Sequence, residues 1–156
     1  MEKAIHDILE AHPFFEGINP GTMEFIGGCG RNTRFDEGDK ICREGDSADS
    51  FYAILEGRVA VQIHMAARGP VTIMTLEGGD ILGWSWLFPP YRWSFDVIAM
   101  EPTRTVQFNA PCLRGKCEED TSLGYDLMKR FAGVFARRLA ATRQQVLDVY
   151  AKSEAS

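Results

Sequence analysis

The fold is decided by the stretch between residues 35 and 61, which reads Phe35-Asp-Glu-Gly-Asp-Lys-Ile-Cys-Arg-Glu-Gly-Asp-Ser-Ala-Asp-Ser-Phe-Tyr-Ala-Ile-Leu-Glu-Gly-Arg-Val-Ala-Val61. Its two Gly-Asp pairs, at 38–39 and 45–46, are typical of tight turns, because glycine reaches a positive φ without strain and aspartate bonds the following backbone. The runs that follow, Phe51–Leu55 and Arg58–Ile63, are short and rich in β-branched and aromatic residues. We therefore expect strands joined by tight turns.

The same pattern continues along the chain. Further short runs lie at Val71–Leu76, Phe95–Ala99 and Thr105–Phe108, with turn residues between them. Many short strands at close spacing predict a mainly β fold with flanking helices, and a jelly roll (double-stranded β-helix) suits this length. The 156 residues suffice for one core, so we expect a single domain over 1–156. We divide it into N-terminal helices at 1–30, a β-roll at 31–110 and C-terminal helices at 111–156.

The last part of the chain predicts a long helix from about Thr121 to Tyr150, with Asp120 as its N-cap. Apolar residues follow one seam with steps of four and three: Met128, Ala132, Phe135, Leu139, Thr142, Val146 and Val149, of which only Thr142 is polar. The seam predicts a homodimer through a short parallel coiled coil. The alternative is a helix that packs only on its own domain.

Composition excludes several classes of function. A net charge of −5 argues against broad binding to nucleic acid or anionic membranes. No apolar run approaches the ~20 residues of a membrane span. The first ten residues do not resemble a signal peptide, and the four cysteines lack C-x-x-C spacing. We therefore expect a cytoplasmic protein with reduced thiols.

No enzymatic site is apparent. The segment Gly83–Leu87 carries a leucine where a nucleophile elbow needs its second glycine. The three histidines, His6, His12 and His64, are too scattered for a metal site. We expect neither catalysis nor a metal or cofactor.

The quoted stretch resembles the cyclic nucleotide-binding domain family, which includes the bacterial cyclic AMP receptor and the regulatory subunits of protein kinase A. The matching pieces are Gly38-Asp39, Gly45-Asp46, Phe51-Tyr52-x-Ile54, Gly57-x-Val59 and Gly78-Gly79-Asp80-Ile-Leu-Gly83, and the run Phe135–Leu139 followed by Thr142 is similar to the family's central helix. The resemblance implies a jelly roll with a phosphate-binding cassette beginning at Gly83. It also implies cyclic AMP, cyclic GMP or another small anion as ligand, with Thr142 and Arg143 at the positions that reach the base.

The sequence departs from the family inside the cassette. Trp84 stands where the family has the glutamate that holds the ribose hydroxyl. The family's Arg-Ala or Arg-Ser pair falls on Trp93-Ser94, with Arg92 one step early, so a bulge is needed to bring Arg92 into place. The aromatic residues gathered here either form a packed mini-core or line a remodelled pocket. The candidate ligand-binding residues are Gly83, Trp84, Ser85, Trp86, Arg92, Trp93, Ser94, Thr142 and Arg143.

The leading hypothesis is a regulatory small-molecule sensor with weakened or changed ligand specificity, in which an anion site at Gly83–Trp86 and Arg92–Ser94 survives while ribose recognition does not. The alternative is a dimeric protein-protein interaction module with a vestigial pocket. Only six residues follow Tyr150, too few for a helix-turn-helix, so we expect no direct DNA binding and an unknown downstream protein partner.

Overall fold

The computed structural model describes residues 5–155 and builds them around two four-stranded sheets. The first sheet has the strand order β1-β8-β3-β6 and the second has the order β2-β7-β4-β5. Their bounds are β1 Gly30–Phe35, β8 Thr103–Asn109, β3 Ser50–Glu56, β6 Ile81–Leu82, β2 Lys40–Cys42, β7 Asp96–Ala99, β4 Arg58–Met65 and β5 Gly69–Glu77. All the pairings are antiparallel, which confirms the predicted jelly roll.

The Gly-Asp turns form as expected. Gly38 and Gly45 have φ values of 90° and 91°, and residues with a Cβ rarely adopt a positive φ of this size. At the β3–β4 turn no residue with a side chain fits in place of Gly57, because a Cβ there would lie 2.5 Å from the Thr103 hydroxyl. These turns fix where each strand reverses, and therefore which side chains enter the roll.

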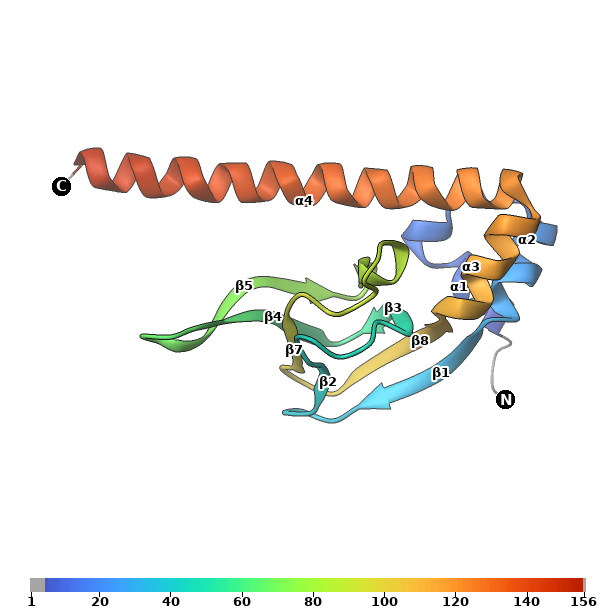
Figure 1. The fold of residues 1–156 in the computed structure, drawn as a ribbon, viewed down its shortest axis with the longest axis horizontal. Helices are drawn as coiled ribbons and strands as arrows, with labels where there is room; N and C mark the ends of the chain where they lie inside the picture. The colour runs from blue at the N-terminus through green and yellow to red at the C-terminus, as the bar shows by residue number, and fades with distance from the viewer. Residues whose placement is uncertain (1–4, 156) are drawn as a thin grey trace.

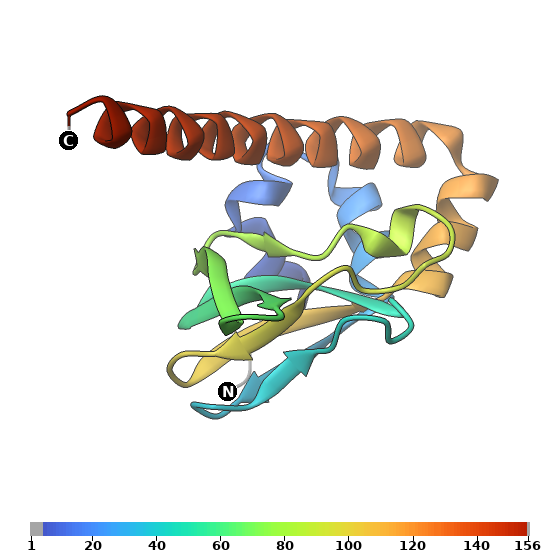
Figure 2. The ribbon, with the colours of Figure 1, turned by 60° about the vertical axis from the view of Figure 1, so that its left-hand side comes forward.

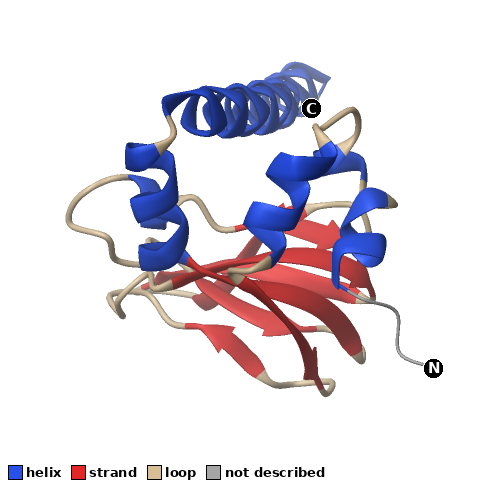
Figure 3. Cartoon of the chain, turned by 90° about the vertical axis from the view of Figure 1, so that its right-hand side faces the viewer, coloured by secondary structure: helices blue, strands red, loops and turns tan. Residues whose placement is uncertain are grey.

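The helices gather on one side of the sheets (Figure 3). They are α1 Ile5–Glu10, η1 Pro13–Phe15, α2 Pro20–Gly27, α3 Ala110–Glu119 and α4 Thr121–Ala155, with one further 3-10 turn, η2 Ser85–Leu87, in the loop after β6. Among residues 5–155, none of these helices is both long and apolar enough to cross a membrane.

The long helix α4 has two different halves. The Asp120 carboxylate accepts hydrogen bonds from the backbone N–H groups of Ser122 and Leu123, which confirms the predicted cap. From 121 to 138, which we call the inner half, the helix packs on the domain through the buried side chains of Leu123, Leu127, Phe131 and Val134. From 139 onward, the outer half, every described side chain is exposed, and the helix runs on past the body of the roll (Figure 1).

The expectation of reduced thiols is wrong for one pair of cysteines. Cys29 and Cys112 form a disulfide across a sequence separation of 83 residues, with their Cα atoms 6.1 Å apart. Cys42 and Cys117 are free. The absence of C-x-x-C spacing excluded only a local pair. The roll brings the residue before β1 beside the first turn of α3, within the range that a disulfide spans.

Candidate functional site

The candidate site lies in the loop after β6, which passes through η2 beneath α4 (Figure 2). Gly83 opens this loop with a φ of 105°. A Cβ at this position would lie 2.7 Å from the end of the Trp93 indole and 3.3 Å from Phe51. Gly83 is therefore required both by its backbone conformation and by the close approach of Trp93.

Trp86 belongs to the core. Its side chain is 1% exposed and stacks on Phe51 with ring centroids 4.8 Å apart and an interplanar angle of 11°. Phe51 in turn stacks on Phe108 at 4.7 Å, and Phe131 of α4 meets the edge of Trp86 at 5.5 Å. Here the mini-core interpretation holds, since Trp86 ties the loop to both β3 and α4.

Trp84 occupies a different environment. It is partly exposed and makes edge contacts with Phe95 at 6.4 Å and with Phe135 of α4 at 6.1 Å. Trp93 also contacts Phe95, with ring centroids 6.0 Å apart. The three aromatic side chains of Trp84, Phe95 and Trp93 thus form a continuous row from α4 to Gly83.

Arg92 and Trp93, in the segment that precedes β7, differ in burial. Arg92 is exposed, and its Nη1 donates to the Gly45 carbonyl at 2.8 Å. Trp93 is only 6% exposed and is fixed by backbone bonds from its N–H to Asp46 O and from the Gly45 N–H to its own carbonyl, both 2.9 Å. In this segment Trp93, and not Arg92, is buried in the domain. Ser94, the next residue, is exposed.

Two polar groups in this loop are buried without a hydrogen-bond partner among the described residues. They are the Ser85 hydroxyl and the Trp86 indole N–H. Buried polar groups in proteins are nearly always paired, because an unmet hydrogen bond costs about 1–3 kcal/mol. Both groups can donate, so their chemistry fits an electron-rich group such as an anion.

A small pocket of about 260 Å³ opens beside Trp93, between β2 and the turn that follows it. Lys40, Arg43 and Asp46 lie at its lining, together with Cys42 and Tyr52. Burial raises the pKa of both the Cys42 thiol and the Tyr52 phenol, so both groups are neutral near pH 7. At this size the pocket falls below the ~300–1,000 Å³ of most small-molecule sites.

Thr142 and Arg143 lie apart from the loop residues. Both are exposed in the outer half of α4, and the Thr142 hydroxyl donates to the carbonyl of Arg138 in its own helix at 2.9 Å. None of the described hydrogen bonds or ring contacts joins them to residues 83–94. The structure brings Gly83, Trp84, Ser85, Trp86 and Trp93 together, and leaves Arg92 and Ser94 exposed.

Sequence reasoning missed two arginines that hold the loop from the helix side. Arg114 of α3 donates to the Trp86 carbonyl at 2.6 Å while its guanidinium lies over the Tyr91 ring. Arg138 of α4 donates to the Ile81 carbonyl of β6, and burial lowers the pKa of its guanidinium. The signal for Arg138 was available, because it continues the helical spacing of the buried Phe131 and Val134.

Comparison with known proteins agrees with this geometry. The family model described as the cyclic nucleotide-binding domain matches residues 32–120. A CRP-like cAMP-activated global transcriptional regulator of Mycobacterium tuberculosis is 24% identical over 144 residues, covering 92% of this chain and 62% of that protein. The acetyltransferase Pat of Mycolicibacterium smegmatis is 34% identical over 94 residues, covering 60% of this chain and 28% of that protein. The chain therefore spans less than two-thirds of the length of these relatives.

Solved structures show the same architecture. A Geobacter metallireducens protein, described as a candidate cyclic nucleotide-binding protein, superposes with a TM-score of 0.78 at 27% identity and covers 89% of this chain and 99% of its own. The catabolite activator protein of Thermus thermophilus gives a TM-score of 0.68 at 20% identity, over 86% of this chain and 61% of that one, and so supports the fold alone.

Proposed function

Since the chain belongs to the cyclic nucleotide-binding domain family, we propose that it is a regulatory sensor whose ligand specificity has moved away from the ordinary cyclic nucleotide. The observation that carries this proposal is the burial of Trp93. The indole lies against Gly83, where the family's arginine and the ligand's phosphate would approach the backbone. An aromatic ring at this place has no positive charge to pair with a phosphate, and it occupies the space that the phosphate would need.

Ribose recognition is weakened by the neighbouring substitution. Trp84 has no acceptor for a hydroxyl group, and its ring is engaged with Phe95 and Phe135. Losing one charged hydrogen bond costs about 1.5–3 kcal/mol, a ten- to hundredfold weakening. Cyclic AMP and cyclic GMP should therefore bind in the high-micromolar range or more weakly.

A small anion remains the best ligand class. The Ser85 hydroxyl and the Trp86 N–H, both without a partner among the described residues, supply two donors in the loop. Trp84 would transmit ligand binding to α4, because its ring contacts Phe135, which lies in the apolar seam of that helix. A ligand that displaces Trp84 would thus alter the seam directly.

The seam supports a homodimer. Of its seven residues only Phe135 is partly buried; Leu139 is 71% and Val149 is 66% exposed in the single chain, and Val146 also lies on the surface. A row of apolar side chains at this spacing is stabilised when a second copy covers it. We propose a parallel dimer through α4, with Thr142 as the polar position of the seam.

Calorimetry tests the ligand proposal. Cyclic AMP, cyclic GMP and their 2′-deoxy analogues should bind weakly and with little difference between the two sugars. The double variant Trp84→Glu with Trp93→Arg should bind cyclic AMP about ten to a hundred times more tightly and should then discriminate against the deoxy analogue. Phe88→Glu places the same charge on an exposed aromatic of the same loop and serves as the control. Tight binding by the unmodified chain, with loss for the deoxy analogue, would contradict the proposal.

Light scattering tests the dimer. The unmodified chain at tens of micromolar should have the mass of a dimer, and Leu139→Asp should give a monomer because it places a charge in the seam. Ala140→Asp, one position outside the seam, should leave the dimer intact. A monomeric unmodified chain would rule the interface out.

The chain's output is expected to pass to another protein. The match to 28% of an acetyltransferase fits a regulatory domain that works beside a catalytic one. We propose no catalysis, no direct DNA binding and a cytoplasmic location for this chain.

The second candidate function is an interaction module with a vestigial pocket. The packing of Trp86 against Phe51 and Phe131 favours it, because these rings fill space that a ligand would need. Loss of every ligand response in the calorimetry, with the dimer retained, would select this second function.

A further inference from the structure

The Cys29–Cys112 disulfide joins the N-terminal part of the chain to α3. Cys29 lies between α2 and β1, and Cys112 lies in the first turn of α3, the helix that leads into α4. The two cysteines differ in exposure, because Cys29 is 7% exposed whereas Cys112 is on the surface. Cys112 is therefore the more accessible of the two cysteines.

A cavity of about 360 Å³ lies directly against the bridge, and both cysteines form part of its wall. The rest of its lining is polar: Arg31, Ser50, Gln107 and Asn109, with the backbone of Gly28 and Gly30. Arg31 donates to the Gln107 side chain at 3.4 Å, and Gln107 donates to Ser50 at 2.8 Å. The cavity thus offers a guanidinium and amide groups next to an accessible cysteine.

We propose that Cys112 is a site of reversible S-thiolation, at which a small anionic peptide thiol binds in this cavity and forms a mixed disulfide. Arg31 supplies the charge that a carboxylate of such a thiol would pair with. The Gln107 and Asn109 amides offer hydrogen bonds to its peptide groups. The proposal does not rest on the ligand site in the loop after β6.

The chemistry is ordinary thiol–disulfide exchange. The thiolate of the small thiol attacks the Cys112 sulfur and forms a new S–S bond. The Cys29–Cys112 bond breaks, and its electron pair goes to the Cys29 sulfur, which takes a proton from solvent. A second molecule of the small thiol then attacks the sulfur of the first molecule in the adduct. This forms the disulfide of the small thiol and releases the Cys112 thiolate. The small thiol is the reductant throughout.

The position of Cys112 suits this role. It lies in the first turn of a ten-residue helix, where its N–H bonds the Asn109 side chain and the helix dipole favours the Cys112 thiolate that leaves when a second small thiol removes the adduct. After the exchange α3 keeps hydrogen bonds to other segments, from Lys116 to the Phe25 carbonyl of α2 at 2.6 Å and from the Ala110 N–H to the Asp49 carbonyl at 2.9 Å. The covalent tie is lost and these hydrogen bonds remain, so the fold should survive the modification.

The test exposes the oxidised full chain to glutathione, quenches with acid and maps the adducts by mass spectrometry. A single adduct on Cys112, with a free Cys29, is expected. Arg31→Ala should slow the reaction with glutathione about two- to fivefold, the range of an exposed ion pair. The reaction with uncharged mercaptoethanol should keep its rate, since it has no carboxylate for Arg31 to bind.

Two further variants complete the design. Cys29→Ser leaves a free Cys112, which oxidised glutathione should modify, whereas Cys112→Ser leaves the buried Cys29 of this pair, which should not react. Cys117→Ser is the matched control, because burial raises the pKa of that thiol and it lines no part of the cavity described above. An adduct on Cys29, an equal effect of Arg31→Ala on both thiols, or a Cys112 that oxidised glutathione leaves unmodified in the Cys29→Ser variant would each overturn the proposal.

Discussion

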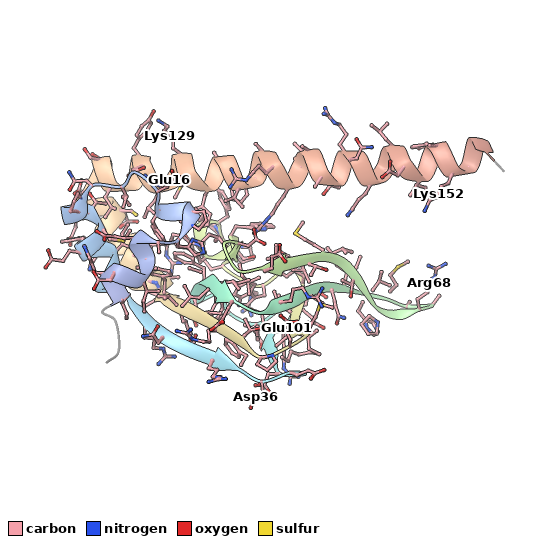
Figure 4. The ribbon with its side chains drawn as sticks, turned by 180° about the vertical axis from the view of Figure 1, so that it is seen from behind. Glu16, Asp36, Arg68, Glu101, Lys129 and Lys152 are labelled. Atoms are coloured by element: carbon pink, nitrogen blue, oxygen red, sulfur yellow. A yellow bond between two sulfur atoms is a disulfide. The ribbon has the colours of Figure 1, made fainter. Side chains whose placement is uncertain are left out.

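The two halves of α4 have similar apolar content but opposite surroundings. The inner half places Leu127 and Phe131 in the core and is held by arginines that bond the backbone of other segments. The outer half carries Leu139, Val146 and Val149, all exposed. Figure 4 shows Lys129 over the domain and Lys152 far along the outer half, with Arg68 at the tip of the β4–β5 hairpin on the same side as Lys152. Helical spacing alone therefore does not say what an apolar stripe contacts. The inner stripe stabilises the domain, and the outer one is available for a partner.

The largest expected effect separates these roles. Phe131→Ala should lower the free energy of unfolding by about 3–5 kcal/mol, because the ring contacts Phe14, Phe51 and Trp86 in the core. Val149→Ala should change the stability of the domain by less than about 0.5 kcal/mol and should weaken only the dimer. Urea denaturation followed by tryptophan fluorescence at low protein concentration measures both. If both variants lower the free energy of unfolding by the same amount, the two halves of α4 do not differ in their contribution to the stability of the domain.

A smaller effect is expected from the polar contacts of the inner half. The Arg130 guanidinium donates to the carbonyls of Phe14 and Glu16, both at 2.8 Å, and to Asp126 at 2.9 Å. Arg130→Met should destabilise the domain by about 1–3 kcal/mol, since it leaves acceptors unpaired in a partly buried place. Lys129→Met, at the neighbouring exposed position, is the control and should stay within about 0.5 kcal/mol. If the two methionine variants unfold at the same urea concentration, the arginine contacts contribute nothing to this half.

The smallest effect concerns pH and the N-terminal turn on which the inner half packs. Burial lowers the pKa of the His12 imidazole below its usual 6.5, and the neutral ring bonds the Ile54 carbonyl and the Phe14 N–H. The unfolded chain takes up a proton near pH 6.5 while the folded chain does not. Stability should therefore be constant above this pH and fall as the pH drops from 6.5 toward the lowered folded-state value.

The His12→Gln variant should flatten this slope in urea denaturation between pH 7.5 and pH 5, a range set by the usual histidine pKa of ~6.5. His64→Gln should retain the slope, because His64 is exposed in the β4–β5 hairpin. An unchanged slope in the His12 variant would assign the pH dependence to other groups.

Much of the fold could be predicted from local chemistry. The strand runs beginning at Phe51 and Arg58, the positive φ at Gly38 and Gly45, and the Asp120 cap all follow from neighbouring residues, and the structure confirms them. Local signals were also sufficient for α3, since Asn109 caps it and Pro111 stands in its first turn. The two-residue strand β6 carries too short a pattern to be recognised.

The candidate site depended on information that the sequence does not hold locally. Whether Arg92 or Trp93 faces inward is decided by the backbone bonds of Trp93 to Gly45 and Asp46, residues almost fifty positions earlier. The pairing of Cys29 with Cys112 likewise requires the closed roll. Periodicity placed the apolar seam on α4, but only the packed structure shows that a second stripe, through Phe131, is the one that the domain covers.

The overhang of α4 also has a mechanical meaning. Residues 139–155 extend about 25 Å at 1.5 Å per residue, and the inner half acts as the clamp of a cantilever. A tilt of about five degrees at the clamp would displace the free end by roughly 2 Å, whereas the clamp itself would move by a fraction of that. The row from Gly83 through Trp93, Phe95 and Trp84 reaches α4 at Phe135, just inside the clamp. A rearrangement too small to disturb the core would thus be geometrically amplified where two copies of the chain would meet.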